Sequence, residues 1–559
     1  MPLSHLTRAP FNLDLAGIDW VQRTMDALSL RDKLAQLFVL ISMGDVSAGE
    51  NPAELAQIAA FKSGGITRFF SADSAREHAF LTNLQANAAI PLLVSADLEG
   101  SRMSIAGGTP VLNPLGLAAI DDVAMTREVS RIMAEEALAM GVNWSFTPVL
   151  DINAAWRSAI VATRGFGRDV ETIKRHALAQ IETFQALGLA ATAKHWPGEG
   201  FDDRDQHLVT TVNPLSMAEW EAQFGTLYRA AINAGVLSVM SAHIALPAFI
   251  RAQNPDAGVE AFRPASVSHA LNIDLSRGQL GFNGVIVSDA SVMGGLGAWS
   301  NLTQAKVDII ANGCDIILFS FNPQGEMQAL LDAVASGRIT QSRLHDAVSR
   351  VLGLKAALGL HVGRGLPQPD GLARLGTPAN REIADGSFRR APTLVKDTQN
   401  LLPLNPVTHR RVLVISGDII SPVHAASAFV LPDRLAARGF AVTLFEKGTR
   451  VTPADFDLVL YLFGEETLLT RSRIFIDWAD LMGGFEAAMT RFWHDVPTMM
   501  ISFGYPYYLY DAPRVPTYIN AYSTLDGVQE AVVDLMLGNA PWTGQNPVDP
   551  FCGLQDAQY

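Results

Sequence analysis

The sequence predicts an α/β protein in which a (β/α)8 barrel of the TIM type is followed by a smaller α/β sandwich domain. Three observations lead to this prediction. Short apolar segments alternate with longer segments of helical period, eight such units precede residue 360, and polar side chains follow the apolar segments. Eight strand and helix units in roughly this length are typical of the barrel fold.

The eight predicted strands are short runs bounded by turn-forming residues. They cover 37–41, 66–70, 92–97, 144–151, 190–195, 238–243, 285–289 and 315–319. Helical periodicity fills intervals between them, at 76–89, 122–140, 169–187, 215–234 and 265–278. This alternation places the predicted barrel at residues 1–360.

A stretch rich in proline, glycine and charge separates the barrel from a second unit. Residues 361–409 are predicted to be a linker that wraps onto this unit. In 410–559, predicted strands at 412–416, 442–446, 458–463, 498–503 and 517–522 alternate with helical segments such as 422–438 and 524–538. We therefore expect a smaller α/β domain with a mostly parallel sheet.

The composition argues against several classes of protein. The chain has 42 basic and 56 acidic side chains and no run rich in Lys and Arg, so we expect neither nucleic acid nor membrane as a partner. Its two cysteines, Cys314 and Cys552, form no disulfide framework or metal motif. No glycine-rich phosphate loop is present, and GGLG at 294–297 is too weak for a dinucleotide fingerprint, so no cofactor is predicted.

The N-terminus lacks an apolar segment after a basic start, and no stretch reaches 18 uncharged apolar residues. We therefore expect a cytoplasmic protein. The sequence does not indicate an oligomeric state.

Six polar side chains stand at the carboxyl ends of five predicted strands, which is the face where barrel enzymes gather their catalytic groups. An Asp at such a position can instead cap a helix, and a His can simply be hydrogen-bonded. Six of them at the same end favour a functional site. They are Asp97, Asp151, Lys194, His195, His243 and Asp289.

The segment KHWPGEGFDDRDQH, residues 194–207, places an Asp two residues before a His. Asp205 can accept the imidazole N–H of His207 and fix its tautomer, which makes His207 a candidate general acid/base. Two alternatives stay open for this segment. One is a solvated charged loop, and the other is a metal site built from Asp202, Asp203, Asp205 and His207.

Seven segments in chain order carry a resemblance to a known family. They are ADLEGSR (96–102), NWSFTPVLDIN (143–153), RGFGRD (164–169), KHWPGEG (194–200), VMSAHIALP (239–247), RPASVS (263–268) and VIVSDASVMGG (285–295). They resemble motifs of the family 3 glycoside hydrolases, in particular the β-N-acetylglucosaminidase branch. The likeness covers nearly the whole chain, because the second domain is similar to the α/β sandwich domain of that family.

The resemblance implies an exo-acting enzyme that hydrolyses terminal β-linked N-acetylglucosamine with retention, through a covalent glycosyl-aspartate intermediate. It implies no metal. On the matching positions Asp289 is the nucleophile, His207 is the acid/base and Asp205 is its partner.

The resemblance also implies a set of residues that hold the nonreducing sugar of a small-molecule or oligosaccharide β-glycoside. An alternative for Arg164 is a structural pair with Asp169 or Asp151, and Asp151 and His243 are expected to support the site. The residues matched to sugar binding are Asp97, Arg164, Lys194 and His195.

A histidine in place of a second carboxylate changes the acid/base chemistry. Its unperturbed pKa is about 6.5 against about 4.3 for Glu, so it is a competent acid near neutrality. Once it has donated its proton it is neutral, and it repels an anionic acceptor less than a carboxylate does. The hypothesis that follows is that inorganic phosphate replaces water as the acceptor, which gives a phosphorylase activity.

Two departures from the family motifs leave the substrate open. Glu199 stands where KHFPGHG has its second His, and Ile105 stands eight residues after Asp97, where cell-wall-recycling members have Arg. Alternatives are therefore a β-glucosidase or a dual-specificity β-glycosidase. An alternative of another class is a catalytically inactive sugar-binding protein on the same barrel.

Overall fold

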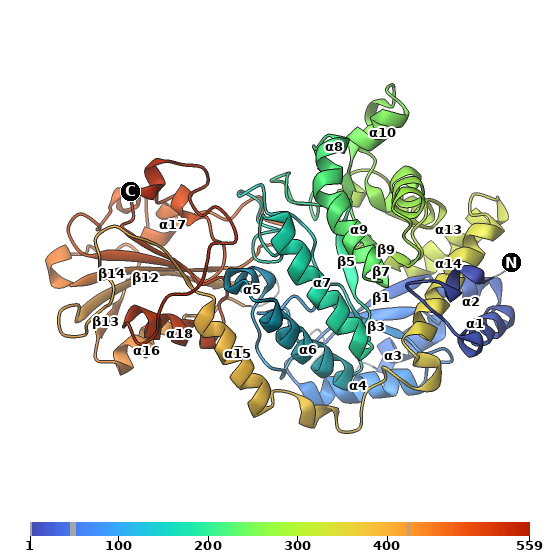
Figure 1. Cartoon of the computed structure of the whole chain (residues 1–559), viewed down its shortest axis with the longest axis horizontal. Helices are drawn as coiled ribbons and strands as arrows, with labels where there is room; N and C mark the ends of the chain where they lie inside the picture. The colour runs from blue at the N-terminus through green and yellow to red at the C-terminus, as the bar shows by residue number, and fades with distance from the viewer. Residues whose placement is uncertain (1–2, 45–51, 422–424) are drawn as a thin grey trace.

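The computed structural model describes residues 3–44, 52–421 and 425–559 (Figure 1). The barrel, with the N-terminus, lies at one end of the molecule in this view, and the second sheet, with the C-terminus, lies at the other. None of the helices in these ranges has the length and apolar composition needed to cross a bilayer.

Eight parallel strands of the described chain form the wall of the barrel. Hydrogen bonds join five in the order β10-β1-β2-β3-β4 and three in the order β5-β7-β9. Single parallel bridges, Trp144 with Ala190 and Val287 with Ile316, connect the two groups at both edges. The strands are β1 (Phe38–Met43), β2 (Gly65–Phe69), β3 (Leu93–Ala96), β4 (Trp144–Ser145), β5 (Thr192–Trp196), β7 (Ser238–Ser241), β9 (Val285–Ser288) and β10 (Ile317–Leu318).

Each of the eight predicted strands overlaps one of these strands, so the barrel prediction is confirmed. The strands are almost continuously buried, as expected where helices cover a parallel sheet. A short parallel ribbon of β6 (Thr211–Val212) and β8 (Ile244–Ala245) extends beyond the ends of β5 and β7.

The helices begin at the polar caps that the sequence supplies. Asp122 accepts backbone N–H groups at the start of α6 and Asp169 does so for α7, and both helices end at a glycine with positive φ. The barrel helices are α1 (Leu15–Ala27), α2 (Leu30–Ala35), α3 (Pro52–Phe61), α4 (Ser74–Ala86), α5 (Pro114–Ile120), α6 (Val123–Met140), α7 (Val170–Leu187), α8 (Met217–Trp220), α9 (Thr226–Asn233), α10 (Pro247–Gln253), α11 (Gly294–Gly297), α12 (Leu302–Ala311), α13 (Pro323–Ala335) and α14 (Gln341–Ala357). The predicted helix at 265–278 is π-helical from Ala270 to Gln279.

The second sheet has the order β11-β16-β15-β14-β12-β13. Only β11, at its edge, runs antiparallel, so the prediction of a mostly parallel sheet is confirmed for the described residues. The strands are β11 (Thr393–Asp397), β12 (Arg411–Ile420), β13 (Ala441–Leu444), β14 (Leu458–Glu465), β15 (Thr498–Ser502) and β16 (Thr517–Asn520), and the helices are α15 (Pro378–Arg390), α16 (Leu431–Ala437), α17 (Trp478–Met482) and α18 (Asp526–Met536).

Two sequence predictions differ from this arrangement. The helix predicted at 422–438 begins only at Leu431, because Ser427 exchanges backbone hydrogen bonds with Ile419 of β12; residues 422–424 lie outside the described residues. The predicted linker 361–409 contains α15, which contacts α6 and α18, and β11, which belongs to the second sheet. The boundaries at 360 and 410 stay predictions.

Candidate active site

A network of opposite charges lies buried where β3 and β5 end. Lys194 donates from Nζ to Asp97 Oδ1 (2.6 Å) and lies 2.8 Å from Glu99 Oε1. Arg164 donates two hydrogen bonds to the same Glu99, from Nε to Oε2 (2.8 Å) and from Nη2 to Oε1 (2.9 Å). Glu99 is 3% exposed and Lys194 is 1% exposed, so the charges stabilise one another in place of water.

The electrostatics keep this network ionised. Burial by itself raises the pKa of Glu99, but Arg164 and Lys194 outweigh it and hold that pKa far below its usual value. Burial opposes the charge of Lys194 as well, yet Asp97 and Glu99 raise its pKa. The network therefore presents fixed charges and polar atoms at the barrel mouth.

The network corrects one sequence interpretation and adds a residue. Arg164 pairs with neither Asp169 nor Asp151, since Asp169 caps α7 and Asp151 bonds His195. Its partner Glu99 was not among the predicted site residues. The available signal was a second carboxylate two positions after Asp97 in ADLEGSR.

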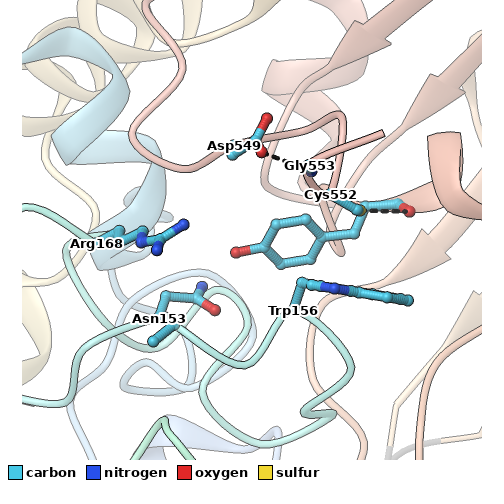
Figure 2. Close-up of a pocket in the computed structure, with 8 residues that line it drawn as sticks. Asn153, Trp156, Arg168, Asp549, Cys552 and Gly553 are labelled. Atoms are coloured by element: carbon cyan, nitrogen blue, oxygen red, sulfur yellow. Dashed lines mark hydrogen bonds between the residues drawn. The ribbon is translucent and has the colours of Figure 1, made fainter. Parts of the chain in front are cut away.

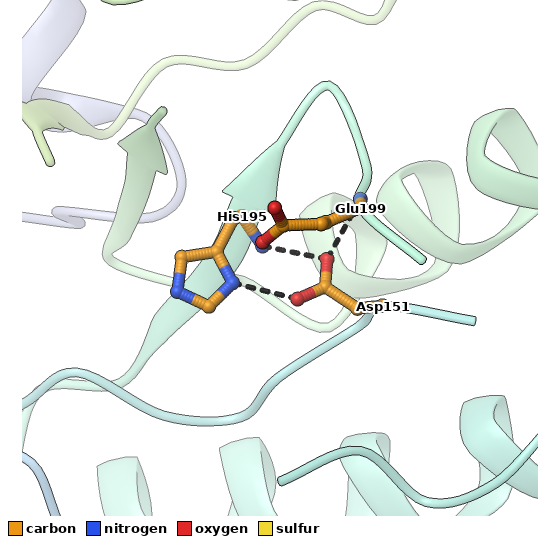
Figure 3. Close-up of side chains that lie close together, drawn as sticks. All are labelled: Asp151, His195 and Glu199. Atoms are coloured by element: carbon orange, nitrogen blue, oxygen red, sulfur yellow. Dashed lines mark hydrogen bonds and ion pairs between the residues drawn. The ribbon is translucent and has the colours of Figure 1, made fainter. Parts of the chain in front are cut away.

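His195 is held by Asp151, as Figure 3 shows. The imidazole Nδ1 lies 2.6 Å from Asp151 Oδ2, and Asp151 Oδ1 accepts the backbone N–H groups of His195 (3.1 Å) and Glu199 (3.0 Å). Arg164 Nη2 lies 3.4 Å from His195 Nε2, and because a guanidinium only donates, Nε2 is the acceptor. Asp151 thus orients His195 and has its oxygens engaged.

Asp151, His195 and Glu199 each offer an atom that could bind a metal. These three atoms lie within 4.8 Å of one another, close enough to surround a cation. The hydrogen bonds among them already use the Asp151 oxygens and the His195 Nδ1 (Figure 3). The arrangement is therefore that of a hydrogen-bonded support for His195. Of the residues in the metal alternative of the sequence, Asp202 binds Arg204 and the backbone N–H of Val212, and Asp205 binds His207.

Asp289 stands directly after β9 with one oxygen free. Its Oδ1 accepts the backbone N–H of Ala290 (2.7 Å), while its buried Oδ2 has no hydrogen-bond partner among the described residues. Burial raises the pKa of Asp289, but the nearby His195, His243 and His207 outweigh it and lower that pKa below its usual value. An ionised carboxylate with a free oxygen has the properties of a nucleophile.

Asp205 and His207 make the hydrogen bond that their spacing predicts. The imidazole Nδ1 lies 2.7 Å from Asp205 Oδ1, and the backbone N–H of His207 donates to the same oxygen (2.7 Å). The side chain of Asp205 is 2% exposed and that of His207 is 22% exposed. The pair is therefore not part of a freely solvated loop. Since Nδ1 faces the carboxylate, Nε2 is the atom available for proton transfer.

Backbone contacts hold the loop that carries this pair. Gly294 donates to His207 O (2.8 Å) and Gly295 to Gln206 O (3.1 Å), which joins the loop to the segment after Asp289. A Cβ at Gly295 would lie 2.3 Å from Gln206 O, so this approach requires glycine. The glycines rejected as a nucleotide motif thus position the candidate acid/base.

The two departures from the family motifs have different surroundings. Glu199 accepts a hydrogen bond from Gln206 Nε2 (3.1 Å), and burial, together with the charge of Asp151, raises its pKa well above the usual value. Ile105 is 7% exposed and belongs to the apolar core. Glu199 therefore contacts the loop of the acid/base pair, whereas Ile105 serves packing.

A small pocket lies between the NWSFTPVLDIN and RGFGRD segments and the end of the chain (Figure 2). Its volume is about 140 Å³, which is room for a few water molecules. It contains none of the predicted site residues. Its lining is Asn153, Ala154, Trp156, Arg168, Tyr507, Asp549, Cys552 and Gly553.

The fold and the carboxylate site are those of a glycoside hydrolase. Residues 29–354 match the glycosyl hydrolase family 3 N-terminal domain, and the chain belongs to this family. The resemblance seen in the sequence motifs is thereby confirmed.

Several relatives match along the whole chain. A β-N-acetylglucosaminidase/β-glucosidase of Cellulomonas fimi is 39% identical over 571 residues, which cover 99% of both proteins. The structure of the β-glucoside phosphorylase BglX bound to 2FGlc is 33% identical with a TM-score of 0.92, covering 99% of this chain and 100% of the other. A family 3 β-N-acetylglucosaminidase from Paenibacillus sp. FPU-7 is 26% identical with a TM-score of 0.80, covering 94% of this chain and 100% of the other.

Proposed function

We propose that this glycoside hydrolase is a retaining, exo-acting β-N-acetylglucosaminidase with Asp289 as nucleophile and His207 as acid/base. One observation supports it above the others. Asp289 keeps a free, buried oxygen on the barrel face that also carries the hydrogen-bonded pair of Asp205 and His207. A second carboxylate is not needed, because the imidazole supplies the proton.

The first step forms a bond between Asp289 Oδ2 and the anomeric carbon, while the bond from that carbon to the leaving-group oxygen breaks. The proton on His207 Nε2 passes to the departing oxygen. Asp205 keeps its hydrogen bond to Nδ1 and stabilises the imidazolium before transfer. In the second step the neutral imidazole takes a proton from water as water displaces Asp289, so two inversions give retention.

The buried charge network is the proposed binding site for the nonreducing sugar. Asp97, 24% exposed in its side chain, is the most accessible carboxylate of the network and is suited to accept from sugar hydroxyls. The ion pairs hold the N–H groups of Lys194 and Arg164 in place before the substrate arrives. We propose that His195 completes this set through Nε2.

A second candidate activity is transfer of glucose or N-acetylglucosamine to inorganic phosphate. Two findings favour it: the whole-chain similarity to a β-glucoside phosphorylase, and the His207 imidazole, which is neutral after it has donated its proton. A carboxylate in that place would repel the incoming anion by a few kcal/mol at about 4 Å in a partly buried site. The relative from Cellulomonas fimi, named for both sugars, favours dual specificity as well.

The test compares kcat/KM for nitrophenyl β-N-acetylglucosaminide and nitrophenyl β-glucoside. A preference of more than about tenfold for the acetamido sugar, or about 1.4 kcal/mol, supports the primary proposal. Comparable rates identify a dual-specificity enzyme. Adding millimolar phosphate and measuring sugar 1-phosphate decides the acceptor.

Asp289→Asn tests the assignment of the nucleophile. We expect this variant to lose at least about a thousandfold in kcat on both sugars. Turnover by the wild type that survives unchanged in Asp289→Asn would refute the nucleophile assignment. Binding without turnover in the wild type would identify a sugar-binding protein.

A further inference from the structure

The second domain reaches into the site through the segment that follows β14, residues 466–470. Glu466 accepts hydrogen bonds from Ser101 Oγ (2.6 Å) and Asn113 Nδ2 (3.1 Å) of the barrel. Thr467 Oγ1 donates to Ala159 O (2.7 Å), and the backbone N–H of Leu468 donates to the same carbonyl (3.0 Å). The segment is therefore fixed against the barrel along its length.

At the end of this segment the backbone N–H of Thr470 donates to Asp205 Oδ2 (2.8 Å), across 265 positions of the chain. The other oxygen, Oδ1, takes both hydrogen bonds from His207. Asp205 is 3% exposed, so water has little access to its carboxylate. Each oxygen thus has its own donor, and the donor of Oδ2 comes from the other domain.

We propose that Thr470 is a positioning residue whose backbone N–H holds Asp205, and through it the imidazole of His207, in the orientation that proton donation requires. This inference rests on the proposed role of His207. The second domain thereby supports the orientation of this pair through a backbone N–H and not through a side chain.

The physical reason lies in the cost of an unpaired buried oxygen. Without the Thr470 N–H, Asp205 Oδ2 loses a charge-assisted hydrogen bond. The carboxylate then turns toward the nearest remaining donors, which are on His207, and the two bonds to Oδ1 are distorted. A glycoside with a poor leaving group needs a well-placed proton, whereas a dinitrophenolate departs with little help.

The variant that tests this is Thr470→Pro, with Thr470→Gly as its matched control. Thr470 has a φ of 62°, which proline at about −65° does not adopt, and proline has no N–H. Glycine keeps the N–H and accepts the positive φ. We expect Thr470→Pro to lose about tenfold in kcat/KM on alkyl glycosides, the effect of one hydrogen bond to a charged group, and less than about threefold on dinitrophenyl glycosides. Thr470→Gly should match the wild type on both.

His207→Ala is measured alongside, which separates the two proposals. A leaving-group-dependent loss in His207→Ala but not in Thr470→Pro overturns the role of Thr470 alone. Equal losses on both leaving groups in His207→Ala overturn the acid/base assignment itself.

Circular dichroism and thermal melting test whether Thr470→Pro is folded. If it is not folded, an ester in place of the Thr470 amide removes the N–H alone. The same leaving-group-dependent loss in the ester variant then supports the proposal, and wild-type rates overturn it.

Discussion

The two halves of the candidate site are built in different ways. The half that we propose to bind the sugar consists of Asp97, Glu99, Arg164 and Lys194, joined by short ion pairs at the barrel mouth. The proton-transfer half, Asp205 and His207, lies on a loop held by backbone N–H groups of the segment after Asp289 and of the second domain. In the proposed function, sugar binding therefore relies on buried charges of the barrel, whereas proton transfer relies on contacts between segments that are remote in the chain.

The largest effect is expected from breaking the sugar-binding half with Glu99→Gln. The substitution keeps the shape but leaves Arg164 and Lys194 without a shared counter-charge in a buried place. We expect the free energy of unfolding to fall by about 3 kcal/mol or more. Urea denaturation measures this loss, and we expect KM to rise as well.

Glu77→Gln is the control for Glu99→Gln, because Glu77 forms a comparable buried pair with Arg68 (2.6 Å). It should lose similar stability while the folded enzyme keeps its KM. An unchanged KM in Glu99→Gln would show that the network is structural alone.

A smaller effect is expected from disturbing the proton-transfer half with Gly295→Ala. The new Cβ meets Gln206 O at 2.3 Å and Val209 O at 2.9 Å, so the loop must shift. A displacement of about 1 Å in a catalytic group costs up to a hundredfold, and we expect at least a tenfold loss in kcat. Gly297→Ala, whose Cβ meets only Leu302 Cδ2 at 3.6 Å, is the matched control. Equal activity of the two variants would contradict the contrast between the halves.

The smallest effect is expected at Glu199, whose backbone N–H donates to Asp151 and whose carboxylate accepts from Gln206 on the loop of the acid/base pair. Burial, with the charge of Asp151, raises its pKa well above the usual value, so the folded chain keeps the proton that the unfolded chain releases. The wild type therefore loses stability from this group as the pH rises above the ordinary Glu pKa. Glu199→Gln removes this dependence.

Urea midpoints of the wild type and Glu199→Gln should agree near pH 4 and separate in favour of the variant toward pH 8, by less than the Glu99 effect. Parallel curves over this range would show that Glu199 is ionised in the folded protein.

The sequence predicted best what local pattern determines. The eight barrel strands follow from short apolar runs, and the bond between Asp205 and His207 follows from their spacing of two residues. Glu99 escaped prediction because its partner Arg164 is 65 positions away and Asp97 already explained the motif. The contact of Thr470 could not be predicted for a further reason. Its donor is a backbone N–H, which almost every residue type has.

The same limit explains the helix predicted at 422–438. The pattern of its side chains allows a helix throughout, but Ser427 pairs with Ile419 at the end of β12 and delays the helix to Leu431. Strand pairing between segments overrides local propensity there.

The carboxylate of Glu466 joins the two domains, and this limits which substitutions the sequence can accept during evolution. It receives hydrogen bonds from Ser101 and Asn113 on the barrel and also from Thr524 on the second domain. Replacing Glu466 removes the acceptor of both barrel side chains at once. We therefore expect a chimera that joins this barrel to the second domain of a relative to need an acceptor at the position of Glu466.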